Sequence, residues 1–419
     1  MSSKSRLFIT GGARLNGRVK ASGAKNAALP ILAASILVKG NYIIKNVPPL
    51  KDVRTMLKML NALGVRAELI QGNEVLIVND RKIRHIAPYE LVTAMRASFF
   101  VAGPILARTG FAKVPMPGGC AIGTRPIDIH LKGFKCMGVD VSIEHGFVQM
   151  LTQHLTGARI YLDFPSVGAT ENIMMAATLA SGSTIIENAA QEPEIIDLAN
   201  FLINSGASIT GAGTSAITIN GQSELRGQDY NIIPDRVEVG TLMIASAITK
   251  GDVFIEGACA DHIEPLIRKL KEAGASIDVH SNGIRVYGGN DLHSVDIETM
   301  PFPGFPTDMQ AQFMSLLCVS SGTGVVTETI FENRFMHVNE LIRMGANIRV
   351  DQRQAIIEGV SQLCGAEVKI TDLRAGAALI IAGLVANGKT SVYGLEHLLR
   401  GYHNLPNKLE SLGAIISSQ

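Results

Sequence analysis

The sequence predicts an α/β protein of six repeats, each a unit of roughly 70 residues with buried helices and an outer sheet. Two recurring glycine patterns and a set of helices that are apolar nearly all round support this fold class. The first pattern is a helix end, a glycine and a strand, as in LNALGVRAEL. It recurs at Gly64, Gly138, Gly206, Gly274, Gly345 and Gly413. Glycine supplies the left-handed conformation that closes a helix, and the β-branched alternation that follows is typical of a strand.

The second pattern is a helix of small apolar residues that ends at a glycine and gives way to a strand. Its glycines are Gly40, Gly110, Gly182, Gly251, Gly322 and Gly388. Both patterns keep one period, and successive glycines of the first are 68 to 74 residues apart. Glycines that merely ended unrelated helices would share no period, so the two markers indicate an internal repeat.

The helices of the second pattern predict how each unit is layered. Segments such as MMAATLASG and LIIAGLVANG are apolar nearly all round, which is typical of buried helices. The sheets are therefore expected outside them. A chain of 419 residues suits two domains, so we expect two domains of three units each.

Composition excludes several classes of protein. The formal net charge is +1, aromatic residues make up 5% and Trp is absent, which argues against a nucleic-acid surface. The start, MSSKSRLFIT, lacks the apolar run of a secretory signal. The longest apolar stretches, such as 377–386, are about half the ~20 residues of a membrane helix. The five cysteines are odd in number and scattered, so we expect a reducing cytoplasm.

The buried helices begin with polar clusters that include cations. Simple N-capping explains Thr307 and Asp308, or Thr371 and Asp372. It does not explain Lys25, Arg96 or Arg374, because a cation in the first turn opposes the helix dipole. Such a cation is useful where an anion binds at the helix start. The pattern therefore predicts anion sites at these repeated helix starts.

The segment VPMPGGCAIGTRPIDI is expected to be a surface loop, since it is rich in Gly and Pro. Cys120 lies at its centre with no apolar periodicity around it, whereas the other cysteines, such as Cys136 and Cys318, are expected to be buried structural residues. Lys113 and Arg125 are close in sequence, and positive charge lowers the pKa of a thiol. Cys120 is thus a candidate acid or nucleophile, with no His or Asp partner defined.

The segments SGAKNAALP, PGGCAIGTRP, FPTDMQAQF, ENRFMH and TDLRAGAAL make the chain resemble the UDP-N-acetylglucosamine 1-carboxyvinyltransferases, a family of enolpyruvyl transferases. The resemblance runs from Lys4 nearly to the last residue. It implies a two-domain inside-out α/β barrel with threefold pseudo-symmetry in each domain. The first domain would span 22–232 and carry the Cys120 loop, and the second would combine 1–21 with 233–419.

The resemblance also implies a reaction. The enolpyruvyl group of phosphoenolpyruvate passes to the 3-hydroxyl of UDP-N-acetylglucosamine by addition–elimination, and phosphate is released. This is the first committed step of peptidoglycan precursor synthesis, on which cell-wall biogenesis, cell shape and cell division depend. The partners would be these two small molecules, with no cofactor, metal, nucleic acid or membrane insertion. The antibiotic fosfomycin would alkylate Cys120.

The resemblance assigns site residues position by position. Cys120 matches the proton donor, and Asp308 matches the carboxylate that contacts the sugar hydroxyl and takes its proton or orients it. The positions that match phosphoenolpyruvate contacts are Lys25, Asn26, Arg125, Arg334, Arg374 and Arg400. The positions that match UDP-N-acetylglucosamine contacts are Arg96, Arg125, Pro126, Ile127, Asp128, Ile129, Ser166, Val167, Asp308 and Ile330.

One position departs from the family pattern, and two rival functions stay open. Phe164 stands where the family often has a lysine, so that contact to the nucleotide is absent. A shikimate-3-phosphate enolpyruvyl transferase would share the fold but is expected to lack the PGGCAIGTRP loop. A non-catalytic paralogue that binds the nucleotide sugar is the other alternative, although every expected polar position besides Phe164 is filled.

Overall fold

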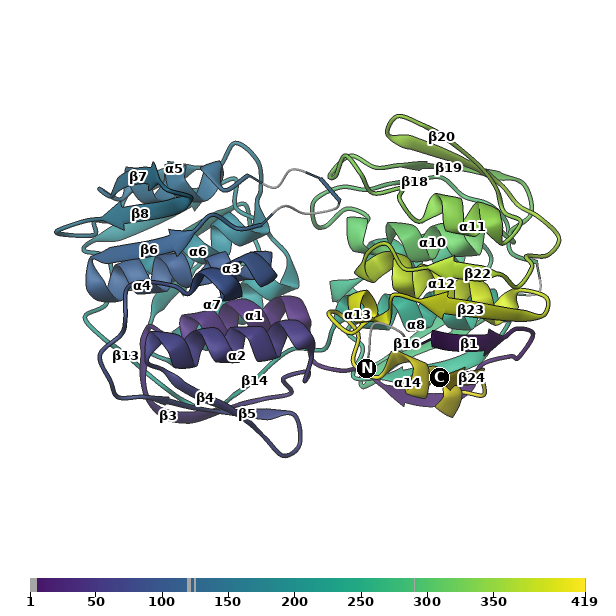
Figure 1. Cartoon of the computed structure of the whole chain (residues 1–419), viewed down its shortest axis with the longest axis horizontal. Coiled ribbons are helices and arrows are strands. Elements are labelled where there is room, and N and C mark those ends of the chain that lie inside the picture. Colours follow the sequence, from purple (N-terminus) through teal and green to yellow (C-terminus); the bar gives the residue numbers. More distant parts are fainter. Residues whose placement is uncertain (1–5, 119–121, 124–125, 290, 419) are drawn as a thin grey trace. The chain divides into compact units, whose positions relative to one another are not determined.

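The computed structural model describes residues 6–118, 122–123, 126–289 and 291–418. It divides into two compact units (Figure 1). The first unit contains the described residues of 23–120 and 125–233, and the second those of 1–22, 121–124 and 234–419. The chain therefore starts in the second unit, builds the first, and returns.

The first unit has three sheets. One has the order β13-β3-β5-β4, with β14 also paired to β3: β3 (Val38–Lys45), β4 (Arg66–Ile70), β5 (Glu74–Asn79), β13 (Leu225–Arg226) and β14 (Tyr230–Asn231). The next has the order β6-β8-β7: β6 (Phe111–Pro115), β7 (Asp140–Glu144) and β8 (Phe147–Leu151). The last has the order β11-β12-β10-β9: β9 (Arg159–Tyr161), β10 (Ser183–Glu187), β11 (Ser208–Thr210) and β12 (Ala216–Asn220).

The helices of the first unit fill the space between its sheets (Figure 1). Their bounds are α1 (Lys25–Ala34), α2 (Lys51–Leu63), α3 (Tyr89–Ala94), the 3₁₀ helix η1 (Arg96–Val101), α4 (Ala102–Thr109), α5 (Asp128–Cys136), α6 (Val167–Ala177) and α7 (Pro193–Asn204). Nearly every residue of α1 and α6 is buried. By contrast, α2 buries one face only, because its apolar residues recur every three or four positions.

The second unit repeats this plan with three four-stranded sheets. One has the order β22-β23-β1-β24: β1 (Arg6–Thr10), β22 (Glu367–Lys369), β23 (Lys389–Tyr393) and β24 (Ile415–Ser418). The next has the order β16-β17-β15-β2: β2 (Asn16–Lys20), β15 (Asp252–Glu256), β16 (Ser276–His280) and β17 (Gly283–Tyr287). The last has the order β18-β19-β21-β20: β18 (Ile297–Glu298), β19 (Thr323–Thr327), β20 (Asn347–Asp351) and β21 (Gln354–Glu358).

Three helices of the second unit, α8, α10 and α12, are buried and pack on one another. The helices and 3₁₀ turns are α8 (Arg236–Ile248), η2 (Ala260–His262), α9 (Glu264–Glu272), η3 (Thr307–Met309), α10 (Gln310–Leu317), α11 (Val338–Arg343), α12 (Leu373–Val385), α13 (Leu395–Leu398) and α14 (Leu405–Ser411). The predicted arrangement of buried helices inside outer sheets is thus confirmed. Among the described residues, no helix combines the length and apolar character needed to cross a bilayer.

The glycine pattern has a direct structural cause. All six glycines of the first pattern have positive φ, from 82° at Gly138 to 105° at Gly64, as helix closure requires. The second pattern has one exception. Its fourth copy places Lys250, not Gly251, in the left-handed region at φ 55°. Gly251 is needed there for space, because a Cβ would lie 2.3 Å from the Leu15 carbonyl oxygen.

Candidate active site

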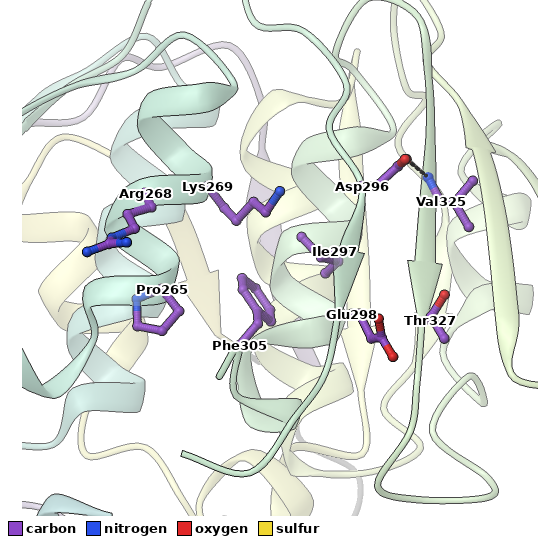
Figure 2. A pocket seen from close by; sticks show the side chains of 9 residues that line it. All are labelled: Pro265, Arg268, Lys269, Asp296, Ile297, Glu298, Phe305, Val325 and Thr327. Atoms are coloured by element: carbon purple, nitrogen blue, oxygen red, sulfur yellow. Dashed lines mark hydrogen bonds between the residues drawn. The ribbon is translucent and has the colours of Figure 1, made fainter. Parts of the chain in front are cut away.

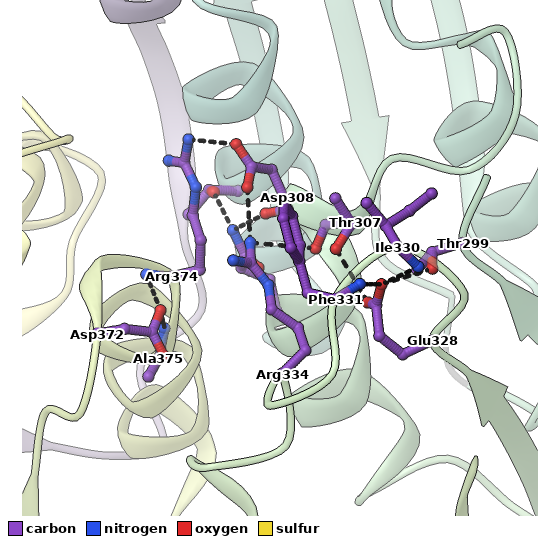
Figure 3. A network of polar contacts seen from close by, with 12 residues as sticks. Thr299, Thr307, Asp308, Glu328, Ile330, Phe331, Arg334, Asp372, Arg374 and Ala375 are labelled. Atoms are coloured by element: carbon purple, nitrogen blue, oxygen red, sulfur yellow. Dashed lines mark hydrogen bonds and ion pairs between the residues drawn. The ribbon is translucent and has the colours of Figure 1, made fainter. Parts of the chain in front are cut away.

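A charged group of predicted site residues in the second unit is centred on Asp308. This residue lies in η3, just before α10. Arg334 Nη2 donates to one carboxylate oxygen at 2.6 Å, and Arg374 Nη2 donates to the other at 2.7 Å (Figure 3). The arginine side chains are only 4% and 5% exposed, while that of Asp308 is 28% exposed. Asp308 is therefore the most exposed of these three side chains.

The charges of this group fix the ionisation of Asp308. Burial by itself would raise the pKa of Asp308, but Arg374 and then Arg334 outweigh it, and Arg236 adds to them. The pKa of Asp308 is held well below its usual value, and the carboxyl is ionised at neutral pH. Burial lowers the pKa of nearby His337 to about 4, so its ring adds no charge.

The start of α12 shows why Arg374 is fixed in place. Asp372 is the N-cap residue, and its carboxylate accepts hydrogen bonds from the backbone N–H groups of Arg374 and Ala375 at 2.9 and 3.2 Å. The capping interpretation is therefore right for Asp372 and wrong for Asp308. No side chain caps η3, and the Asp308 carboxylate binds two guanidinium groups instead.

Sequence reasoning missed Glu328, which organises the segment beside Asp308. This buried carboxylate accepts from the hydroxyls of Thr299 and Thr307, both at 2.9 Å, and from the backbone N–H groups of Ile330 and Phe331 at 2.9 and 3.1 Å (Figure 3). It thereby ties the predicted contact residue Ile330 to the residue before Asp308. An acidic residue after a strand looks like any exposed loop acid, so the sequence carried no signal for it.

Lys25 and Asn26 open α1 in the first unit. Lys25 is buried, and its Nζ lies 2.8 Å from a carboxylate oxygen of Asp52, which is buried in α2. Asn26 is half-buried beside it in sequence. A cation buried at a helix start needs an anionic partner, and Asp52 supplies one within the protein.

A second group in the first unit contains the residues predicted to hold the nucleotide sugar. Arg96 Nη2 donates to the carbonyl oxygen of Pro126 at 3.4 Å, so η1 meets the residues that lead into α5. Ser166 caps α6 by accepting from the Ala169 N–H at 3.3 Å. The start of α6 lies against the start of α5 and the end of η1, because a Cβ on Gly168 would lie 3.3 to 3.5 Å from the rings of His130 and Phe100.

The structure therefore brings Arg96 to Pro126, and places α6 with Ser166 and Val167 against α5, which follows Ile127 and opens with Asp128 and Ile129. Phe164, the departure from the family pattern, is exposed. Arg400 is half-buried between α13 and α14 of the second unit. Cys120 and Arg125 lie outside the described residues.

The cysteines give one correction. Cys318 is buried as expected, but Cys136, Cys259 and Cys364 are exposed. Cys136 is the last residue of α5, where the helix surface turns to solvent. Apolar neighbours in sequence therefore did not mean burial at that position.

A cavity of about 490 Å³ in the second unit lies apart from the predicted residues (Figure 2). It lies between α9 and strands β18 and β19. Its wall consists of Pro265, Arg268, Lys269, Asp296, Ile297, Glu298, Phe305, Val325 and Thr327. Asp296 is already engaged there, since it accepts from the Val325 N–H at 2.8 Å.

Comparison with known proteins identifies relatives along nearly the whole chain. A profile of the family described as EPSP synthase (3-phosphoshikimate 1-carboxyvinyltransferase) matches residues 9–409. UDP-N-acetylglucosamine 1-carboxyvinyltransferase 1 of Caldanaerobacter subterraneus subsp. tengcongensis is 54% identical over 99% of both chains. UDP-N-acetylglucosamine 1-carboxyvinyltransferase 2 of Carboxydothermus hydrogenoformans is 56% identical over 98% of both.

Solved structures share the fold. The enolpyruvyl transferase NikO from Streptomyces tendae superposes with a TM-score of 0.89 at 25% identity, and 99% of each chain is covered. EPSP synthase from Acinetobacter baumannii superposes with a TM-score of 0.79 at 18% identity, again over 99% of each chain. The second likeness, at this low identity, bears on the fold alone.

Proposed function

The chain belongs to the family of UDP-N-acetylglucosamine 1-carboxyvinyltransferases, and we propose that it transfers the enolpyruvyl group of phosphoenolpyruvate to the 3-hydroxyl of UDP-N-acetylglucosamine with release of phosphate. It is therefore a transferase of peptidoglycan precursor synthesis that acts on small molecules. The names of the matched profile and of the relatives both denote a 1-carboxyvinyltransferase, so the reaction class is common to them. Relatives of 54–56% identity favour the UDP-sugar as acceptor over shikimate 3-phosphate.

One structural observation carries this proposal: the Asp308 carboxylate has buried guanidinium groups at both of its oxygens. The reaction needs a carboxylate close to the sugar hydroxyl and positive charge where phosphoenolpyruvate and the tetrahedral intermediate carry negative charge. Asp308 with Arg334 and Arg374 supplies both in one group. Lys25 and Asn26, Arg125 and Arg400 are the further proposed contacts to phosphoenolpyruvate.

We propose the following steps. The sugar 3-hydroxyl oxygen attacks the central carbon of phosphoenolpyruvate, while the Cys120 thiol gives a proton to the methylene carbon. The hydroxyl proton is lost towards Asp308. A tetrahedral phosphoketal forms, and the carbon–oxygen bond to phosphate then breaks as the methyl group loses a proton, which restores the carbon–carbon double bond.

The electrostatics refine the role of Asp308. A carboxyl group whose pKa is held far below 7 is a weak base, so in the described arrangement Asp308 serves mainly to orient the hydroxyl. Its affinity for a proton rises when an anionic substrate shares Arg334 and Arg374. We therefore propose that binding of phosphoenolpyruvate converts Asp308 from an orienting group into a proton acceptor.

The proposed contacts of the nucleotide sugar are Arg96, the starts of α5 and α6, Ile330 and Asp308. The helix starts offer backbone N–H groups to an anion such as a diphosphate. We further propose a cytoplasmic location, because the exposed free thiols of Cys136, Cys259 and Cys364 suit a reducing compartment.

The decisive experiment measures phosphate release from phosphoenolpyruvate with either UDP-N-acetylglucosamine or shikimate 3-phosphate as the acceptor. We expect release only with the UDP-sugar. Release only with shikimate 3-phosphate would replace the proposed acceptor. Binding of the UDP-sugar without release in either reaction would identify a non-catalytic protein.

A further inference from the structure

A chain of buried polar side chains supports Asp308 from within the second unit. The Tyr402 hydroxyl, in a residue only 2% exposed, lies 2.9 Å from Thr241 Oγ1 of α8 and 3.0 Å from Gln312 Nε2 of α10. Gln312 Nε2 also donates to the backbone carbonyl of Asp308 at 2.9 Å. Thr241 Oγ1 donates to the Val237 carbonyl at 2.8 Å.

The direction of each hydrogen bond in this chain follows from the number of protons. A hydroxyl has one proton, and that of Thr241 goes to the Val237 carbonyl, so its oxygen accepts from the Tyr402 hydroxyl. The Tyr402 oxygen in turn accepts from one N–H of Gln312, whose other N–H is donated to Asp308. Loss of the Tyr402 hydroxyl would therefore take away the acceptor of a Gln312 N–H and the closer donor to Thr241 Oγ1, which then keeps only the Gln312 nitrogen at 3.3 Å. It would also remove a contact of the Arg374 guanidinium.

Tyr402 also anchors the segment that carries Arg400. The intervening Gly401 lies close against α12, because a Cβ there would come within 2.2 Å of Leu373 Cδ1 in the first turn of that helix. The Tyr402 N–H donates to the carbonyl at the end of α13, and its ring lies 5.5 Å from the guanidinium carbon of Arg374. Arg400 is thus attached to a segment fixed on both α12 and α10.

We propose that Tyr402 is a positioning residue that holds Arg400 in place relative to Asp308 and Arg374, through its hydroxyl contacts with Gln312 and Thr241. The inference rests on the proposed role of Arg400 in binding phosphoenolpyruvate. A cation that is held in place binds an anion without first losing conformational freedom. Release of the segment should therefore weaken phosphoenolpyruvate binding and leave the chemical step nearly unchanged.

The test is Tyr402→Phe, which removes the hydroxyl and keeps the ring. We expect KM for phosphoenolpyruvate to rise about three- to tenfold, with kcat within about twofold and KM for the UDP-sugar unchanged. Thr241→Val removes the acceptor of the hydroxyl and should give the same selective rise, so the outcome does not depend on one variant. Tyr230→Phe is the matched control. It loses a 2.6 Å hydrogen bond to Asp197 in the first unit, and it should lower stability without changing either KM.

A double-mutant cycle with Arg400→Ala separates positioning from general weakening of the fold. If Tyr402 acts through Arg400, then Tyr402→Phe should change KM for phosphoenolpyruvate by less than about twofold in the Arg400→Ala background. Independent, multiplying effects, or a normal KM in both Tyr402→Phe and Thr241→Val, would overturn the inference. A normal KM in Arg400→Ala alone would instead remove Arg400 from the proposed substrate site.

Discussion

Asp308→Asn replaces a carboxylate with an amide of nearly the same shape between two buried guanidinium groups. Both ion pairs are short, at 2.6 and 2.7 Å, and the arginines are almost fully buried. Removing one partner of a buried pair costs about 3–5 kcal/mol, because a buried charge is left uncompensated. Asparagine keeps one acceptor oxygen, so we expect the lower end, about 3 kcal/mol. For a domain of 150–250 residues this lowers Tm by roughly 6–12 °C.

The chain offers a matched control in Asp252→Asn. Asp252 also pairs with an arginine of the second unit, Arg285, at 2.7 and 2.8 Å, but these two side chains are 37% and 43% exposed. Solvent screens such a pair, and its loss costs about 0–1 kcal/mol, or at most about 4 °C. Thermal unfolding of the wild type, Asp308→Asn and Asp252→Asn in one buffer measures the two shifts in Tm. Equal shifts for both variants would refute the argument from burial.

The pH dependence gives the same experiment a second readout. The pKa of folded Asp308 lies below the 3.8 of an unperturbed aspartate. Its ionised form therefore contributes stability above about pH 4, and this is lost as the pH falls towards the folded pKa. The Tm difference between wild type and Asp308→Asn should be full at neutral pH and shrink in acid. A difference that grew in acid would contradict the sign of the shift.

Kinetics complete the test of Asp308. Loss of a group that accepts or orients a proton should lower kcat by about 100-fold or more, while the UDP-sugar still binds within about tenfold of its normal affinity. Turnover at the wild-type rate would mean that Asp308 only neutralises the arginines.

Three further predictions concern other parts of the chain. Cys120→Ser should be nearly inactive, whereas Cys120→Asp should retain substantial turnover with an optimum at lower pH, because a carboxyl group can still supply a proton. The Asp variant should also resist fosfomycin. Equal loss of activity in both variants would indicate covalent catalysis by sulfur. Lys25→Ala should reduce kcat/KM by about ten- to a hundredfold, whereas the exposed Lys58 should tolerate alanine; normal kinetics in Lys25→Ala would take the start of α1 out of the site. Glu171→Gln should raise Tm, and by more as the pH rises. Burial, then Glu194 and Glu192, raise the pKa of Glu171, so the stability that its protonated form contributes is full below pH 4.5 and is lost as the pH rises through the folded pKa. A pH-independent difference in Tm would contradict this.

The repeat and its layering could be predicted because they depend on local chemistry. A glycine with positive φ follows each first-pattern helix, and a helix that is apolar all round can be stable only inside. Both properties are visible within ten or so residues of sequence. The exception at Lys250 was hidden, since only the approach of the Leu15 carbonyl shows why Gly251 is needed.

The contacts of the site could not be predicted from spacing. Asp308 meets arginines that follow it by 26 and 66 residues, and Gln312 meets Tyr402 across 90 residues. Such pairs depend on how α10 and α12 pack, which periodicity does not report. Capping was the simple interpretation of Asp308, and the packing of two arginines against it decided otherwise.

The return of the chain to the second unit has a consequence for how the protein is made. Strand β1 pairs with β23 and β24, and β2 pairs with β15, so the earliest strands to be synthesised need partners from much later in the chain. At roughly 5–20 residues per second, a ribosome takes on the order of tens of seconds to reach β24. During that interval the first unit can already fold, because its residues all lie before 234. Strand β1 meanwhile lacks the two strands with which it pairs. Nascent chains stalled after 233 should therefore contain a protease-resistant first unit, preceded by a protease-sensitive N-terminal segment of about 20 residues.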